Sequence, residues 1–207
     1  MTLSALEVKN LKQAPAFDGV LPAVLSRWSA RAFADRDVSA TDLKRVFEAA
    51  RWAASSNNEQ PWKFLVGRRN SPVHARIFEC LMGFNKSWAG SAPVLILGVA
   101  STKFAHNGAA NTYALYDLGA ASSYLTLQAA ALGLTSHQMA GYDHDAARKA
   151  LQIPEDYVLG TVIALGYQGE PADLNHEQLI EREIAPRSRK PLKDFVLSAW
   201  GEAAELA

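Results

Sequence analysis

The segment 111–132 constrains the fold more than any other part of this sequence, because it is the longest helical candidate and is filled with small side chains. It holds the runs Gly119-Ala-Ala-Ser-Ser123 and Ala129-Ala-Ala131, and Gly133 then ends it. Small residues at this density let another backbone approach closely. We therefore expect a deeply packed helix.

Apolar runs predict strands on either side of this helix in the sequence. Pro93–Ala100 is continuous and rich in Val, Leu and Ile, which is typical of a strand buried on both faces. Val158–Tyr167 is the clearest other strand, and Trp62–Gly67 is a shorter candidate. With the helices, these runs predict an α+β fold with three or four strands.

Four further helices are predicted from the helical spacing of apolar residues and from cap signals. The clearest begins at the capping pattern Ser39-x-x-Asp42. The expected ranges are 18–26, 39–53, 71–82 and 143–151.

The chain turns polar after Gly169 and ends in an extended tail. Pro171, Pro186 and Pro191 space this tail, and an amphipathic segment at 192–200 closes it. No linker, repeat or low-complexity tract divides the sequence. We therefore expect one domain over 1–207, whose tail from about residue 170 needs a partner surface.

Charge and cysteine content exclude several classes of protein. Lys plus Arg and Asp plus Glu both total 21, so the net charge is zero and neither a nucleic acid nor an anionic membrane partner is indicated. Cys80 is the only cysteine, which excludes an internal disulfide and a cysteine-rich zinc site and fits a cytoplasmic location. No apolar run resembles a signal peptide or reaches the ~20 residues that cross a bilayer. We expect a soluble cytoplasmic protein.

Several common catalytic motifs are missing from the sequence. It contains no P-loop, no G-x-G-x-x-G after a strand, no G-x-S-x-G and no S-x-x-K. The five histidines are scattered without the spacing of metal ligands. Metal and serine hydrolase chemistry are therefore not expected.

Three polar clusters carry the remaining chemistry, and the first is the alternating motif Arg27-x-Ser29-x-Arg31. In an extended segment these three side chains point the same way. Two guanidinium groups beside a hydroxyl form a receptor for phosphate, whose oxygens Arg binds through paired, charge-assisted hydrogen bonds. On spacing alone a solvated Arg-rich loop is the more frequent explanation, so both interpretations stay open at this point.

The other two clusters lie far along the chain. Ser55-Ser-Asn-Asn58, followed by Gln60-Pro-Trp62, gathers hydroxyl and amide groups in a turn between helix and strand. Such a turn can cap a helix end, or it can supply the donors and acceptors that bind a polar heterocycle. The basic cluster Arg187-Ser-Arg189-Lys190 in the tail would, alone, be a solubilising charge run.

Taken together, the three clusters resemble the FMN-dependent nitroreductase family in residue type, order and spacing. The matching blocks are Arg27–Arg31, Ala49–Trp62 and Arg187–Leu192, and Ser-Ser-x-Asn-x-Gln-Pro-Trp is the most specific piece. The intervening segments agree as well, for example Gly90-Ser-Ala-Pro-Val94 before the buried strand. The resemblance extends from about residue 21 to residue 196.

The resemblance implies a fold, an assembly and a cofactor. It implies a central mixed sheet flanked by helices, and a homodimer in which the tail wraps the partner subunit and one FMN per subunit lies at the interface. Its phosphate and ribityl side would be held by Arg27, Trp28, Ser29 and Arg31, with Arg187 and Arg189 from the tail. Ser55, Ser56 and Asn58 would come from the other subunit, and Gln138, Met139, Ala140 and Gly141 would lie along the isoalloxazine, with a backbone N–H near N5.

Three positions depart from the family pattern. Trp28 stands where relatives often carry a second basic residue or His, Ala54 where many have Pro, and Ala140 where some branches have Glu beside the flavin. The last position bears on the choice of donor and acceptor. Neither NADH versus NADPH nor a particular acceptor is therefore transferred to this chain.

The implied activity is that of an FMN-dependent NAD(P)H oxidoreductase. A reduced nicotinamide would give hydride to flavin N5 and leave, and a flat electrophile (a nitroaromatic, quinone, enone or flavin) would then take the electrons at the same place, with ping-pong kinetics. No catalytic protein side chain is needed. Phe104, Tyr113 and Tyr116 are candidate walls of the substrate pocket, although a role as core aromatics is equally compatible with the sequence.

Two other functions stay open on the same scaffold. One is a different redox outcome, such as reductive dehalogenation or flavin destruction. The other is a non-catalytic FMN-binding protein.

Overall fold

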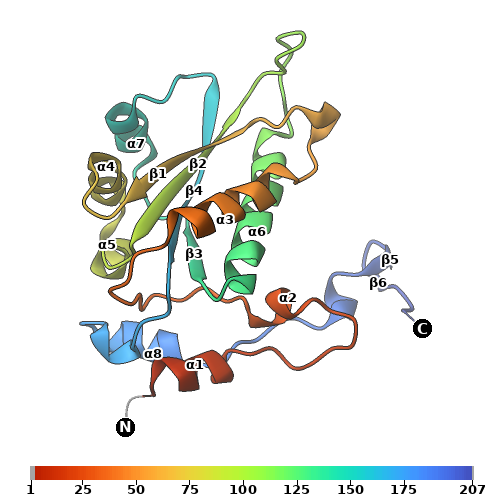
Figure 1. Ribbon diagram of the computed structural model, residues 1–207. Helices are drawn as coiled ribbons and strands as arrows, with labels where there is room; N and C mark the ends of the chain where they lie inside the picture. Colours follow the sequence, from red (N-terminus) through yellow and green to blue (C-terminus); the bar gives the residue numbers. More distant parts are fainter. Residues whose placement is uncertain (1–2, 207) are drawn as a thin grey trace.

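The computed structural model describes residues 3–206, which form a four-stranded sheet with helices packed on both faces (Figure 1). The sheet order is β1-β2-β4-β3. The strand bounds are β1 Trp62–Arg68, β2 Val94–Ser101, β3 Thr135–Met139 and β4 Tyr157–Gly166. The short strand β3 therefore forms one edge of the sheet.

The α+β class is confirmed, but the expected mixed sheet is antiparallel throughout the part of the chain that the structure describes. β2 and β3 run in the same direction and are joined through a helix, as in a parallel unit. β4 lies between them and pairs antiparallel with both, so no parallel pair forms. The position of β4 between β2 and β3 thus makes the sheet antiparallel instead of mixed.

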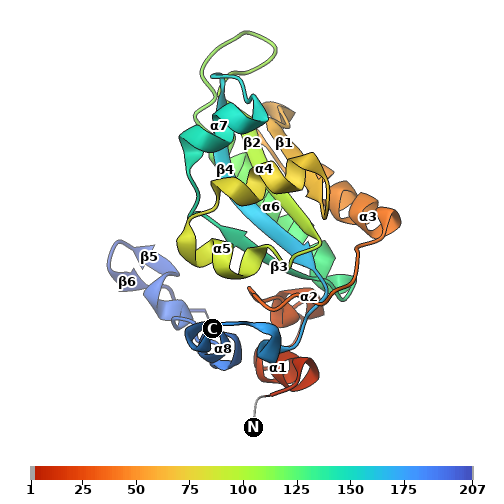
Figure 2. The same ribbon diagram turned by 90° about the vertical axis from the view of Figure 1, so that its left-hand side faces the viewer.

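The strand β2 is buried on both faces, as its apolar run predicted. Leu95 and Leu97 pack into the core on one side, while Val94 and Ile96 pack into the core on the other. This alternation follows from the two-residue period of a strand between two layers of helices. Figure 2 shows these layers, with α4, α5 and α7 on one face and α3 and α6 on the other.

The long helix α6 (Ala114–Ala131) lies where the small-residue run predicted it. Gly133, at φ +75°, adopts the left-handed conformation that lets the chain turn from α6 into β3. One face, with Leu118, Ala121 and Leu125, is buried against α3 (Ala40–Arg51) and the sheet. The opposite face is exposed, and Tyr116 there is 79% exposed. The expected deep packing thus holds for one face of the helix within this chain.

Cap signals located three of the four other predicted helices correctly. Ser39 Oγ accepts the Asp42 N–H at 3.0 Å, and Asp143 Oδ1 accepts the Ala146 N–H at 2.9 Å. The resulting helices are α3, α4 (Pro72–Cys80) and α7 (His144–Leu151), while the first expected helix is shorter, as α2 (Pro22–Ser26).

Several elements were not predicted. They are the helices α1 (Ala5–Leu11), α5 (Gly83–Ala89) and α8 (Glu177–Ile184), the short 3-10 turns η1 (Ser56–Asn58) and η2 (Pro171–Asp173), and the strand β3. The amphipathic segment at 192–200 forms the turn η3 (Leu192–Asp194) and part of a hairpin of β5 (Leu197–Ala199) and β6 (Glu202–Ala203). In Figure 1, α1 and α8 lie together below the sheet, and the tail extends from there to the C-terminus.

No helix within residues 3–206 combines the length and apolar character that a membrane crossing requires.

Candidate functional site

The segment Arg27–Arg31 connects α2 to α3 and alternates between buried and accessible side chains. Trp28 and Ala30 are buried, Ser29 is exposed, and both arginines are half-buried. Arg27 and Ser29 line one hollow, whereas the Arg31 guanidinium lies over the rings of Phe84 and Trp88. In the alternating motif, Arg27 and Ser29 therefore face one hollow, whereas Arg31 faces α5.

The two tail arginines lie against this segment of the same chain. Arg187 donates from Nη1 to the Arg27 carbonyl at 2.6 Å and from Nη2 to the Leu25 carbonyl at 2.8 Å. Burial, together with the neighbouring Arg189, lowers the pKa of Arg27, and the pKa of Arg187 is lowered for the same reasons. Three cations from two distant parts of the sequence thus lie close together.

The hollow beside them has a volume of about 430 Å³ and lies between the α2 region, α6 and β3. Gln138 from the predicted segment 138–141 lines it and accepts a 3.0 Å hydrogen bond from Thr161 Oγ1. The buried Ser136 Oγ also lines it and has no hydrogen-bond partner among the described residues. The full lining is Val24, Arg27, Ser29, Ser123, Thr126, Leu127, Ser136 and Gln138.

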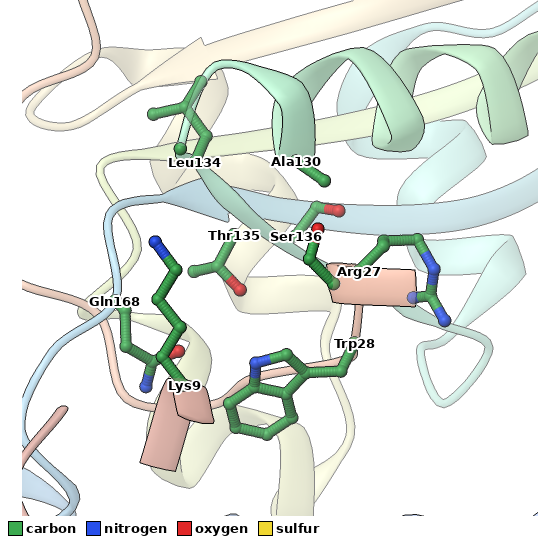
Figure 3. Close-up of a pocket in the computed structure, with 10 residues that line it drawn as sticks. Lys9, Arg27, Trp28, Ala130, Leu134, Thr135, Ser136 and Gln168 are labelled. Carbon is green, nitrogen blue, oxygen red and sulfur yellow. The ribbon is translucent and has the colours of Figure 1, made fainter. Parts of the chain in front are cut away.

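A smaller and more enclosed hollow, of about 70 Å³, is lined by Trp28 and Lys9 and shares Arg27 and Ser136 with the first (Figure 3). Figure 3 shows the Trp28 ring turned toward Lys9, while the Arg27 guanidinium points away from Lys9 and Gln168. Trp28 also packs beneath the Lys12 ammonium, 4.6 Å from the ring centroid. Lys9 and Lys12 come from α1 and its C-terminal cap, so this helix supplies positive charge beside Trp28.

Glu183 is a fully buried carboxylate that holds the Arg31 segment in place. Its oxygens accept the backbone N–H of Arg31 at 2.9 and 3.1 Å, the N–H of Ala32 at 3.0 Å, and Gln168 Nε2 at 3.1 Å. Lys12 Nζ donates to the carbonyls of Arg182 and Ala185 at the end of the same helix. A carboxylate on α8 therefore positions a loop more than 150 residues earlier in the chain.

Sequence reasoning missed Glu183, Lys9, Lys12, Ser136 and Gln168. The capping box of Ser4 and Glu7 was a usable signal for α1, which brings both lysines to the site. Helical spacing was the available signal for Glu183, which lies four residues after Leu179 and three after Ile180, whereas exposed Glu181 lies four residues after Glu177.

The predicted segment 138–141 runs from the edge strand β3 into a tight connection. Met139 is buried, whereas Gln138 and Ala140 are exposed. The Gly141 carbonyl accepts the Met82 N–H at 3.0 Å and Asn85 Nδ2 at 2.9 Å, which fastens α5 to this segment. A Cβ at Gly141 would lie 2.8 Å from Asn85 Nδ2, so a side chain there would displace the Asn85 amide.

The serine and asparagine cluster forms a separate site at the other end of α6. The Ser56 N–H donates to Asp117 Oδ2 at 3.1 Å, and Ser55 Oγ accepts the Gln60 N–H at 3.0 Å. Asn57 and Asn58 both have φ +53°, a left-handed backbone that few residues other than glycine adopt. Ser55 and Ser56 line a pocket of about 220 Å³ with Ala54, Tyr113, Tyr116 and Asp117.

Of the three aromatic residues predicted to line the substrate pocket, two lie at the serine site and one does not. Tyr113 and Tyr116 join Ser55 and Ser56 at this pocket and are exposed, so they are not core residues. Phe104 does not line the pocket and instead packs at a tilt against His106, with ring centroids 5.6 Å apart. Its loop is tied to Glu59, whose Oε1 accepts the Ala105 N–H at 2.9 Å.

The serine site lies at the first turn of α6, whereas the hollow of the arginine site lies against the second half of that helix. Asp117 at the serine site and Leu127 at the arginine site are ten residues apart on this helix, which is about 15 Å at a rise of about 1.5 Å per residue. One chain therefore does not bring the two predicted parts of the cofactor site together.

Within residues 3–206, no group of three or more His, Cys, Asp or Glu side chains is arranged to hold a metal ion.

Comparisons with known proteins agree with the resemblance of the motifs. The family model described as "Nitroreductase family" matches residues 24–87 and 78–167, which is more than half of the chain. A protein of Archaeoglobus fulgidus with the provisional name NADH dehydrogenase/NAD(P)H nitroreductase is 29% identical over 157 residues, covering 74% of this chain and 87% of that protein. A Thermus thermophilus protein named NADH dehydrogenase is 28% identical over 193 residues, covering 78% of this chain and 93% of that protein.

Comparison with a solved structure also supports the nitroreductase family. A crystal structure described as an oxidoreductase containing FMN has a TM-score of 0.83 and 32% sequence identity, covering 89% of this chain and 94% of that chain. On the match of the family model and on this likeness, the chain belongs to the nitroreductase family.

Proposed function

We propose that this chain is an FMN-dependent oxidoreductase that takes electrons from NADH or NADPH and passes them to a small flat electrophile. The observation that carries the proposal is the group of three arginines beside the hollow at β3, which contains the unpartnered Ser136 hydroxyl. The similar solved oxidoreductase contains FMN, and the relatives' names refer to NADH or NAD(P)H.

The residues at this hollow fit the phosphate and ribityl parts of FMN. No carboxylate oxygen of residues 3–206 lies within 4.0 Å of the guanidinium groups of Arg27, Arg187 or Arg189, so their charge is available to an anion. Such cations bind phosphate oxygens through charge-assisted hydrogen bonds. Ser29, Ser136 and Gln138 offer the hydroxyl and amide groups that would hold ribityl hydroxyls.

The ring of FMN would lie along the segment 138–141 at the edge of the sheet. FMN, when bound, supplies the hydride transfer that no side chain of this protein can perform. Exposed Ala140 and half-buried Gly141 keep bulky side chains away from that edge. Arg31 contributes a half-buried positive charge on the α5 side, which would stabilise negative charge on the ring.

We propose a homodimer in which each FMN is held by both subunits. Two copies that pack along the exposed face of α6 in opposite directions would bring the arginine site of one chain to the serine site of the other. The exposed Gly119 and Ser123 permit close approach, and Tyr116 and Tyr124 supply apolar area on that face. Ser55, Ser56, Asn58, Tyr113 and Tyr116 would then complete the partner's site, and the tail would extend over the partner.

Mixed dimers test this arrangement. Arg27→Ala damages the arginine site, and Ser56→Tyr fills the serine site. Homodimers of either variant should bind no FMN, whereas a mixed dimer keeps one undamaged site and should bind one FMN per dimer. A mixed dimer without FMN would show that each site is built within one chain.

Catalysis itself is tested with the visible spectrum of the purified protein under anaerobic conditions. We expect a flavin spectrum that bleaches on addition of NADH or NADPH, and ping-pong initial rates, because donor and acceptor occupy the same place in turn. A flavin spectrum that never bleaches would indicate a non-catalytic FMN-binding protein. A protein that takes up no FMN would overturn the proposal.

A further inference from the structure

A row of aromatic and cationic side chains leads from β3 to the surface beside α5. The His137 ring lies 4.7 Å from the Trp88 ring, and Arg31 Cζ lies 6.0 Å from the centroid of Trp88 and 5.9 Å from that of Phe84. Arg182 Cζ lies 4.8 Å from the Phe84 centroid. The row therefore ends in one aromatic ring flanked by two guanidinium groups.

Neither of these two positive charges forms a direct ion pair with a carboxylate of the described residues. No carboxylate oxygen of the described chain lies within 4.0 Å of the Arg31 or the Arg182 guanidinium. Arg31 Nε is buried and has no hydrogen-bond partner among the described residues. Glu183 is the nearest acid that acts on Arg31, but its carboxylate already accepts backbone N–H groups.

The charges of the ionisable side chains in this row do not change near neutral pH. Burial, followed by the charge of Arg31, lowers the pKa of His137 to about 4, so the imidazole is neutral. Burial and the like charge of Arg182 lower the pKa of Arg31, while Glu183 raises it, and the guanidinium stays protonated. The pair therefore keeps two positive charges.

The pair lies beside the segment to which the proposed function assigns the flavin ring. The first turn of α5 is fastened to Gly141 through the Met82 N–H and the Asn85 side chain. Phe84 is 40% exposed and Met82 is 57% exposed, so two apolar side chains on this turn are open to a ligand. An exposed ring with adjacent cations suits a flat ligand that carries an anionic group.

We propose that Arg31, Phe84 and Arg182 form a subsite for the oxyanion of a flat ligand that binds over the flavin. The inference rests on the proposed function and states that the flavin site prefers ligands that carry an oxyanion. The phosphate of FMN is assigned to Arg27, Arg187 and Arg189, so the oxyanion belongs to a substrate. It is either the carboxylate of an aromatic acceptor or a phosphate of the nicotinamide donor.

Benzoate and benzamide test the subsite, because they are flat and similar in size but differ in charge. If the oxyanion is the carboxylate of an acceptor, calorimetric titration of the FMN-loaded protein should give benzoate about tenfold tighter binding than benzamide, as a charge-assisted hydrogen bond predicts. Arg182→Gln should remove the difference. Arg76→Gln, which changes an exposed arginine on α4, should keep it.

Steady-state kinetics with the same variants identify the source of the oxyanion. Loss of the preference for benzoate in Arg182→Gln, at unchanged KM for NADH, indicates a carboxylated acceptor. A raised KM for NADH with no preference for benzoate in any variant indicates the donor phosphate. If Arg182→Gln changes neither the preference for benzoate nor the KM for NADH, the subsite proposal is overturned. The proposed function still stands in that case, provided that the protein binds FMN and oxidises NADH. Absence of FMN from the visible spectrum of these samples would instead overturn the proposed function.

Discussion

The two ends of α6 carry polar sites that are held together in different ways. At the end near β3, Arg187 and Glu183 form hydrogen bonds with the backbone of the segment 25–32, which lies more than 150 residues earlier in the chain. At the other end, the Ser55–Asn58 turn is held by its own left-handed backbone and by one carboxylate, that of Asp117. The first site is cationic and depends on long-range contacts, while the second contains the Asp117 carboxylate and is mostly local. Substitutions should therefore cost more at the first site.

The largest effect is expected for Glu183→Ala. It leaves the backbone N–H groups of Arg31 and Ala32 without their acceptor, takes one of two acceptors from the Gln168 amide, and removes a carboxylate that acts on Lys12 and Arg31. We expect a loss of about 3–5 kcal/mol in the free energy of unfolding, measured with urea. Glu181→Ala, on an exposed position of the same helix, should change it little. A similar loss for both variants would contradict the role given to Glu183.

Arg187→Ala should weaken FMN binding about 100-fold, which corresponds to the loss of a charge-assisted contact and of the bonds to Leu25 and Arg27. Fluorescence titration with FMN measures the change. The exposed Lys190 provides a matched control, because Lys190→Ala removes one charge from the same basic cluster. Equal weakening in the two variants would show that general charge, and not the placement of Arg187, governs binding.

Acid should destabilise the first site through His137. Its Nδ1 lies 3.0 Å from the Ala30 carbonyl oxygen, and burial beside Arg31 lowers its pKa to about 4. The unfolded chain, with a pKa near 6.5, binds the proton first, so stability is fully present above about pH 6.5 and is lost as the pH falls toward 4. We expect a loss of about 2 kcal/mol between pH 7.5 and pH 5 that His137→Gln abolishes. An identical pH dependence of urea unfolding in both proteins would refute this.

The smallest effect is expected in the serine site. Asn57→Ala places a β-carbon in a left-handed conformation that asparagine tolerates better, and should cost about 1 kcal/mol of unfolding free energy. Asn57→Gly should cost nothing, because glycine has no such restriction. If Asn57→Ala destabilised the protein as much as Glu183→Ala, the contrast between a local and a long-range site would fail.

Much of the secondary structure and the family follow from local sequence signals. Helical spacing and cap residues act within a few positions, so α3, α4, α6 and α7 were predictable, as were the strands with long apolar runs. The Arg, Ser and Asn clusters were also visible as patterns. The short strand β3 and the helices α1, α5 and α8 were not, since each is stabilised mainly by what it packs against.

The sequence alone determined the family, the main helices and strands, and which polar clusters belong together. Only the tertiary structure decided that β4 lies between β2 and β3, that Glu183 holds the Arg31 segment, and that Phe84 lies between two arginines. It also placed the arginine and serine clusters at opposite ends of one helix. The physical reason is range: a cap or a periodic face is a property of neighbouring residues, whereas burial of a charge depends on segments that meet after more than 150 intervening residues.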